Sequence, residues 1–182
     1  MRALVVHESV FDNTRDIARA VADGLSIHLP VTVCDVTRVP RTVPADVGVL
    51  VVGGPTHVFG MTRPDSRRDA ATQAADDPDR IGIRLADLDR PQRVVSAAAF
   101  DTRVRHPRLP GSAAHRALAR LRRLGFLLLD EPTSFWVAGT PGPLLDGEVH
   151  RAYRWGEQVG ARMSPPALQT SPPEPATPRR PS

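Results

Sequence analysis

Two hydroxyl side chains, Ser9 and Thr14, lie in a short segment that joins an apolar run to an amphipathic one. The segment begins at His7 and leads into the first turn of a predicted helix. That turn carries free backbone N–H groups and the positive end of the helix dipole, and hydroxyls beside them complete a phosphate site. The segment therefore predicts phosphate binding. The alternative is that its hydroxyls only cap the helix.

Two common phosphate-binding patterns are absent from this segment. It contains no lysine, which excludes a Walker loop, and no G-x-G-x-x-G, which argues against a dinucleotide fingerprint. A phosphate site here must therefore depend on backbone N–H groups and hydroxyls.

Two later segments are predicted to meet the same ligand. In the first, Gly53 to Met61, paired glycines allow the backbone to approach a planar ligand closely, and His57 and Phe59 offer flat side chains beside it. His57 is equally well explained as an ordinary surface histidine. The second runs from Ala99 to Arg103 and follows another apolar strand.

Strands must position these three segments. Continuous β-branched runs predict buried strands over 3–6, 47–52 and 94–99, and a weaker alternation predicts an edge-like strand over 31–36. A fifth strand is predicted over 126–129 and 134–137, interrupted at Glu131-Pro132, and the sequence Gly53-Gly54-Pro55 is expected to break the third.

Amphipathic stretches alternate with these strands. They predict helices from Asn13 to near Gly24, from Ala114 to Gly125, and over a last segment whose inner face holds Leu145, Val149, Tyr153 and Gly156. Weaker helical patterns cover 63–75 and 83–88. Alternating strands and helices predict an α/β fold with a doubly wound parallel sheet, in which ligands bind at the carboxyl ends of the strands.

At this point the sequence resembles the flavodoxin family, whose first loop reads Ser/Thr-x-Ser/Thr-Gly-x-Thr and binds the phosphate of flavin mononucleotide (FMN). Ser9, Asn13 and Thr14 match that motif, whereas Phe11 stands where a hydroxyl is common and Asp12 where glycine is usual. Gly54-Pro55-Thr56 is a familiar form of the family's second loop. The resemblance covers about residues 1 to 162 and implies a five-stranded parallel sheet of order 2-1-3-4-5, flanked by helices.

The resemblance also implies a set of cofactor-binding residues. The phosphate would be held by the first loop, at Ser9, Val10, Phe11, Asn13 and Thr14. The flavin ring would be held by the second loop and, on its pyrimidine side through backbone contacts, by the third: Pro55, Thr56, His57, Phe59, Gly60, Phe100, Asp101 and Thr102. Asp101 and Glu8 are interpreted as loop-capping carboxylates, because neither has a partner placed for general acid catalysis.

The implied function is electron transfer by an FMN-binding redox protein, with a partner protein or a small quinone-like molecule. The aromatic Phe11 also resembles flavodoxin-like quinone reductases that use NAD(P)H, and this alternative stays open. A flavin-free binding module is the other alternative, because Phe11 and Asp12 depart from the phosphate motif.

Composition limits the other classes of function. The 24 basic residues are all arginine and aromatic residues make up 4%, so the net charge of +4 reflects codon bias better than nucleic-acid binding. Cys34 is the only cysteine, which excludes an internal disulfide and a multi-cysteine metal site. No apolar run suits a signal peptide or a membrane span, so we expect a cytoplasmic protein with one domain over 1–163 and a disordered Pro-rich tail over 164–182.

Overall fold

The computed structural model describes residues 1–8, 12–56, 85, 87–106, 111–139 and 141–163. Some of the residues and segments singled out in the sequence lie outside these ranges: Ser9, Val10, Phe11, His57, Phe59, Gly60, the weak helical pattern over 63–75, and the tail over 164–182. What the sequence predicts for them stays a prediction.

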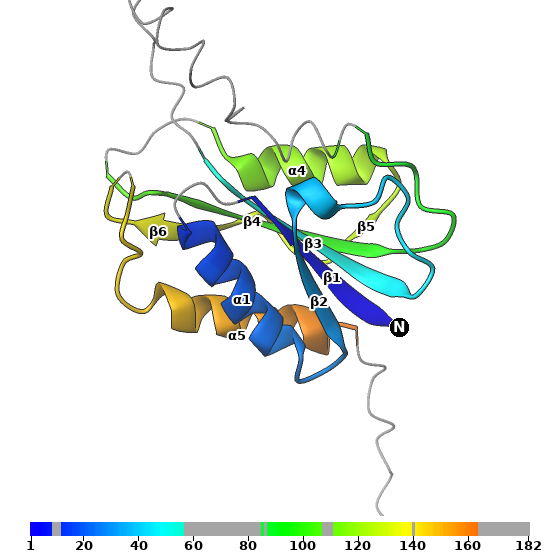
Figure 1. Ribbon diagram of the computed structural model, residues 1–182, viewed down its shortest axis with the longest axis horizontal. Helices are drawn as coiled ribbons and strands as arrows, with labels where there is room; N and C mark the ends of the chain where they lie inside the picture. Colours follow the sequence, from blue (N-terminus) through cyan, green and yellow to red (C-terminus); the bar gives the residue numbers. More distant parts are fainter. Residues whose placement is uncertain (9–11, 57–84, 86, 107–110, 140, 164–182) are drawn as a thin grey trace, which may run out of the picture.

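The described residues form one parallel sheet with helices on both of its faces (Figure 1). Its strands are β1 (Arg2–His7), β2 (Val31–Asp35), β3 (Val47–Pro55), β4 (Ser96–Val104), β5 (Leu127–Leu128) and β6 (Thr133–Val137). The order is β2-β1-β3-β4-β5, and β6 pairs with β4 further along the same edge. The predicted order 2-1-3-4-5 is confirmed, and so is the interrupted fifth strand.

Two strands extend further than the sequence predicts. The expected break at Gly53-Gly54-Pro55 and the expected loop over 99–103 are wrong, because β3 runs to Pro55 and β4 to Val104. Pairing overrides the turn propensity of these residues: β4 lies between two strands, and its Thr102 pairs with Pro55 of β3 and with Phe135 of β6. Residues 100–102 are therefore strand residues.

Helices α1 (Asn13–Leu25) and α5 (Glu148–Ala161) cover one face of the sheet, and α4 (Ala113–Arg123) covers the other (Figure 1). A short 3₁₀ helix, η1 (Val36–Arg38), follows β2. The predictions for α1 and α4 are confirmed in type and position. Helix α5 begins after Leu145, and Val149 is 50% exposed, so the predicted inner face is wrong at these positions.

The buried face of α5 is formed instead by Ala152, Trp155, Gly156 and Val159. Gly156 permits a close approach to α1, since a Cβ there would lie 2.2 Å from the carbonyl oxygen of Val21. The backbone of α1 therefore packs directly on α5, which fixes where α1 begins relative to the sheet.

The core has two layers, one on each face of the sheet. Between the sheet and the α1/α5 pair, the rings of Phe100, Phe135 and Trp155 meet edge to face, with centroids 5.7 to 6.2 Å apart. On the other face, aliphatic side chains of β1, β3 and α4 pack with Phe126. These layers leave the carboxyl edge of the sheet as the place where loops, helix N-termini and polar side chains meet.

Candidate functional site

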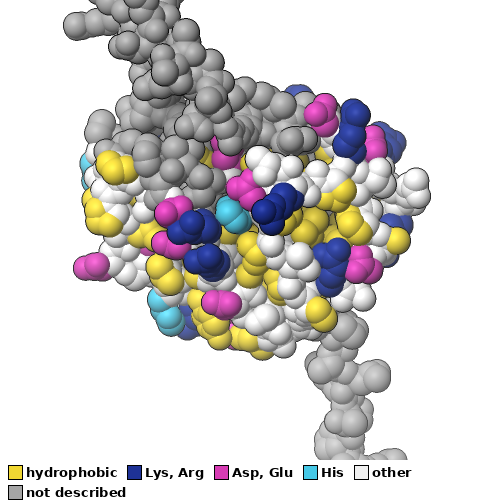
Figure 2. Space-filling model, in the orientation of Figure 1, with side chains coloured by type: hydrophobic (Ala, Val, Ile, Leu, Met, Phe, Trp, Pro, Cys, Tyr) yellow, Lys and Arg dark blue, Asp and Glu magenta, His cyan; other side chains and the backbone are white. Residues whose placement is uncertain are grey.

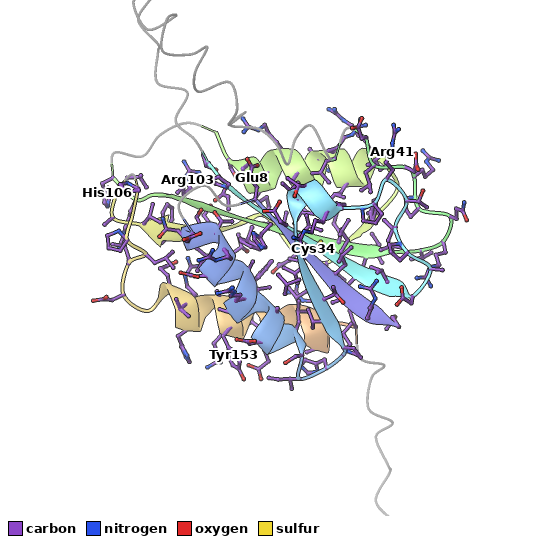
Figure 3. The ribbon with its side chains drawn as sticks, viewed as in Figure 1. Glu8, Cys34, Arg41, Arg103, His106 and Tyr153 are labelled. Atoms are coloured by element: carbon purple, nitrogen blue, oxygen red, sulfur yellow. The ribbon has the colours of Figure 1, made fainter. Side chains whose placement is uncertain are left out.

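The carboxyl ends of β1, β3 and β4 form one edge of the sheet, and both α1 and α4 begin there. Glu8 and Arg103 carry their labels at this edge in Figure 3, and the label of His106 lies further out on the same side. The residues that the sequence marks as ligand-binding and that the structure describes all lie along this edge or at the N-terminus of α1: Asn13, Thr14, Pro55, Thr56, Phe100, Asp101 and Thr102.

Among the described residues, no side chain caps the start of helix α1. Its N-cap residue Asp12 has φ 60° and ψ −20°, the left-handed conformation that favours glycine, and makes no capping hydrogen bond. The Asp12 carboxylate pairs with Arg15 at 2.8 Å, so it does not satisfy the N–H groups of the first turn. The first intrahelical bond runs from Asp16 N–H to the Asp12 carbonyl. The earlier N–H groups have no intrahelical acceptor and are suited to an anion.

Thr14, in the first turn of α1, contacts β4 through its side chain. Its Oγ1 lies 2.7 Å from Thr102 Oγ1, and the two residues are only 2% and 5% exposed. This buried contact joins the predicted phosphate segment to the predicted ring segment. The two segments therefore belong to a single site.

Asn13 contacts a different part of the chain. Its Nδ2 donates to the carbonyl of Pro141 at 2.5 Å, and a Cβ at Gly142, whose φ is +146°, would lie 2.8 Å from the same amide. The loop between β6 and α5 therefore rests against the start of α1. This loop is not among the segments that the sequence marks as ligand-binding, although its Gly-Pro pattern signals a turn.

Helix α4 begins quite differently. Asp101, which is completely buried, accepts at Oδ2 from the hydroxyls of Thr56 at 2.8 Å and Ser112 at 2.6 Å, and from the N–H of Ala114. Thr56 Oγ1 in turn accepts from Ala113 N–H at 2.9 Å. The interpretation of Asp101 as a capping carboxylate is confirmed. Ser112 is the N-cap residue of α4, and its side chain accepts from the N–H of His115. The sequence does not mark Ser112 as a site residue.

Phe100 contributes only its backbone to the edge. Its side chain is fully buried and packs over Gly53, where a Cβ would lie 2.0 Å from the ring. A glycine at position 53 is therefore required by the core, beneath the predicted ring site. The Phe100 ring belongs to the aromatic layer and is not available to a ligand.

His7 Nδ1 and Asp101 Oδ1 are buried polar atoms at this edge that have no hydrogen-bond partner among the described residues. Burial lowers the pKa of His7, and Arg15 and Arg19 of α1 lower it further, against the opposing effect of Asp35. A neutral imidazole thus lies at the end of β1, 7% exposed, next to the start of α1. Sequence reasoning does not select His7, because a histidine after an apolar run has no distinctive signal.

The described part of the chain offers no support for a metal site, a membrane span, a reactive thiol or a nucleic-acid interface. It contains no group of three or more metal-ligating side chains placed for an ion, and no helix with the length and apolar character of a membrane span. The thiol of Cys34 on β2 has a pKa raised by burial and by Asp35, which disfavours a reactive thiolate. Figure 2 shows basic and acidic side chains interspersed over the face in view, unlike a nucleic-acid interface.

One apolar pocket lies on the α4 face of the sheet. It is lined entirely by aliphatic side chains, among them Val6, Val52 and Leu88. With no polar group in its lining, it does not suit a phosphorylated ligand. The polar carboxyl edge remains the candidate site.

Comparison with solved structures places this architecture in a known fold. Flavodoxin 1 from Bacillus cereus superposes with a TM-score of 0.66 at 16% identity, over 90% of this chain and all of that one. A flavodoxin from the domain Archaea superposes with a TM-score of 0.59 at 19% identity, over 89% and 98% of the two chains. The rubredoxin:oxygen oxidoreductase of Desulfovibrio gigas matches with a TM-score of 0.61 at 16% identity, with 88% of this chain aligned to 35% of that longer one.

No protein-family model and no curated protein matches the sequence. The chain therefore has the flavodoxin-like fold, as the sequence predicts, at a sequence identity that shows the fold alone.

Proposed function

We propose that this chain binds FMN at the carboxyl edge of its sheet and acts as a redox protein that transfers electrons. The observation that carries the proposal is the open N-terminus of α1, which meets the buried Thr14 and Thr102 hydroxyls at the end of β4. In sheets of this strand order, FMN occupies the crevice at the switch point between β1 and β3. Both strands end beside this helix terminus.

The residues present fit the phosphate of FMN. Backbone N–H groups of the first turn of α1 and the Thr14 hydroxyl are donors, and the helix dipole adds a favourable potential for a dianion. The Asp12 carboxylate at the N-cap is an unfavourable charge, and its pairing with Arg15 reduces the repulsion.

The residues present also fit the ring. The extended backbone of β3 and β4, at residues 54–55 and 101–102, offers peptide groups at the end of the sheet, and pairing on both sides of β4 holds them in register. When FMN is bound, it supplies one- and two-electron chemistry, and the protein supplies its position and polarity. Electron transfer requires only that an edge of the ring be accessible to a partner.

Isothermal titration of the purified protein with FMN and riboflavin tests the proposal. We expect stoichiometric FMN binding with at least tenfold preference over riboflavin, since only FMN carries a phosphate and each 1.4 kcal/mol of interaction is about a factor of ten. Equal affinities would remove the phosphate site, and absence of binding would refute the proposal.

Redox function is tested on the FMN complex. Reductive titration followed by visible spectroscopy should show reversible reduction of bound FMN. Turnover assays with NADH or NADPH as the reductant, with and without a quinone as the oxidant, then separate an electron carrier from a quinone reductase. A carrier shows little turnover of either nicotinamide, whereas a quinone reductase oxidises one of them only when quinone is added.

A further inference from the structure

The contact between Thr14 and Thr102 is unusual because it pairs two hydroxyls inside the protein. The residues are 88 positions apart in sequence, and their oxygens lie 2.7 Å apart. Both side chains are at least nine-tenths buried. Water therefore has little access to either hydroxyl.

Thr102 is held rigidly. It pairs with Pro55 of β3 and with Phe135 of β6, and its carbonyl accepts from Thr56 N–H at 2.8 Å. A β-branched side chain on such a backbone has few rotamers. Its hydroxyl is therefore a fixed point against which the first turn of α1 is placed.

A count of protons shows that one is left over. Each hydroxyl carries one proton, and a single hydrogen bond between the two oxygens uses one of them. No other acceptor for the second proton is found in the described parts of the chain. A buried donor without an acceptor is unfavourable, so the second proton is suited to an acceptor that a ligand brings.

The position of Thr14 decides which hydroxyl keeps this proton. Thr14 is the second residue of α1, next to the N–H groups where an anion is favoured, whereas Thr102 lies within the sheet. If Thr102 donates to Thr14, the Thr14 proton points toward the anion, and the chain of two hydrogen bonds strengthens both of them. The reverse arrangement leaves the proton on Thr102, away from the helix terminus.

We propose that Thr102 is a positioning residue for phosphate recognition: it donates to Thr14 Oγ1 and so directs the Thr14 hydroxyl proton to the phosphate monoester of the ligand. This inference rests on the proposed FMN site and adds to it a specificity determinant. Thr102 then contributes to the preference for FMN over riboflavin without contacting the phosphate.

The test compares the ratio of FMN to riboflavin affinity among variants at position 102. Thr102→Val removes the hydroxyl at constant shape and should lower the ratio about tenfold, as expected for a hydrogen bond to a charged group. Thr102→Ser keeps the hydroxyl and should restore the ratio to within about threefold of wild type. Thr32→Val, an exposed threonine on β2, is the matched control and should leave the ratio unchanged.

A double-variant cycle separates positioning from general damage. If Thr102 acts through Thr14, then Thr102→Val in a Thr14→Val background should cause no further loss in the ratio. An additive loss, or an equal loss of FMN and riboflavin affinity with a lower melting temperature, would overturn the inference. Should the valine variant fail to fold, Thr102→Ser keeps the inference falsifiable, because a loss of the ratio despite the retained hydroxyl would overturn it.

Failure of this inference is distinguishable from failure of the proposed function. A wild-type protein that binds no FMN, or does not prefer it, refutes the proposed function and this inference with it. A wild-type protein that prefers FMN while Thr102→Val keeps the full preference refutes only the role of Thr102.

Discussion

The N-termini of α1 and α4 lie at the same edge of the sheet and differ in how their first turns are satisfied. At α4, Ser112 accepts from His115 N–H, and the Asp101 carboxylate accepts from Ser112 and Ala114. At α1, the N-cap Asp12 turns its carboxylate to Arg15 and makes no cap. One helix terminus is closed by the protein's own oxygens, and the other is left open by the residues that the structure describes.

This difference shows which terminus can take a ligand. A buried carboxylate already neutralises the positive end of α4, so an added anion there would meet both a filled cap and a like charge. At α1, the N–H groups of the first turn have no intrahelical acceptor, and the Thr14 hydroxyl lies beside them. Under the proposed function, the phosphate is therefore expected at the N-terminus of α1 and not at that of α4.

The largest expected effect comes from opening the closed terminus. Asp101→Ala leaves the hydroxyls of Thr56 and Ser112 and the N–H of Ala114 without their acceptor in a buried site. We expect a loss of about 3 kcal/mol in the free energy of unfolding. Thermal and urea unfolding of the apo-protein measure it, with a fall in melting temperature of about 9 °C.

Asp101→Asn is the matched control for that change. It keeps one carbonyl oxygen for these donors and should lose less than half as much stability. A melting temperature within about 2 °C of wild type for Asp101→Ala would mean that the cap contributes little, and the contrast between the two termini would lose its basis.

A smaller effect is expected where the open terminus meets the loop after β6. Asn13→Ala removes the bond from Nδ2 to the Pro141 carbonyl and should lower the free energy of unfolding by about 1 kcal/mol. Asn13→Asp sharpens the test, because an added carboxylate in the first turn stabilises a helix but cannot donate to Pro141. Thermal melts should rank Asn13→Asp below wild type. A rise in its melting temperature would show that the dipole outweighs this contact.

Replacing Asp12 tests the open terminus directly. Asp12→Gly removes a carboxylate near the predicted phosphate, and a repulsion of about 1 kcal/mol corresponds to about fivefold tighter FMN binding. The Arg15 pair already offsets part of that repulsion, so fivefold is an upper value. Titrations at two salt concentrations should show the gain shrinking as salt rises.

The apo-protein should melt at nearly the same temperature after this change. Glycine relieves the left-handed conformation at φ 60°, but it also gives the unfolded chain more freedom, by about the same 1 kcal/mol. Weaker FMN binding together with an earlier melt would mean that Asp12 stabilises α1 in solution, contrary to its uncapped geometry.

The sequence predicts the positions of the central strands and the start of α1 well, because those features depend on local patterns, whereas the strand order comes from the resemblance to the flavodoxin family. A continuous apolar run such as 47–52 predicts a strand that is buried on both faces, without knowledge of which strands flank it. The spacing of Ile17, Val21 and Leu25 likewise defines the buried face of α1. Thr14 could also be selected from local pattern, since it lies in the first turn of the helix that follows a buried strand.

The ends of β3 and β4 and the contacts between loops could not be predicted in this way. Residues 53–55 have turn propensity and become strand only because β4 is available to pair with them. Asn13 contacts Pro141, which is 128 positions away in the sequence, and a local sequence pattern cannot predict such a contact. The difference between an open and a closed helix terminus is likewise a property of tertiary contacts.

The smallest expected effect concerns His7, which lies beside the open terminus. Burial lowers its pKa in the folded protein, so the unfolded chain takes up the proton first as pH falls. Between the lowered pKa and the ordinary value of about 6.5, the unfolded state binds more protons, and the stability contributed by neutral His7 is lost as pH falls through this window. Above about 6.5 that contribution is complete. His7→Gln should therefore remove part of the decrease in apo-protein melting temperature between pH 7.5 and 5.5.

An anion bound at the start of α1 should change the pKa of His7, and this change tests whether the phosphate lies at that terminus. The negative charge of a phosphate beside Arg15 and Arg19 opposes their effect on the imidazole and raises the pKa of His7 toward its ordinary value. With FMN bound, the difference between wild type and His7→Gln in the pH dependence of melting temperature should then become smaller, while the part caused by burial remains. If FMN leaves the difference between wild type and His7→Gln as large as in the apo-protein, the phosphate does not lie at α1, and the open terminus is not the ligand site.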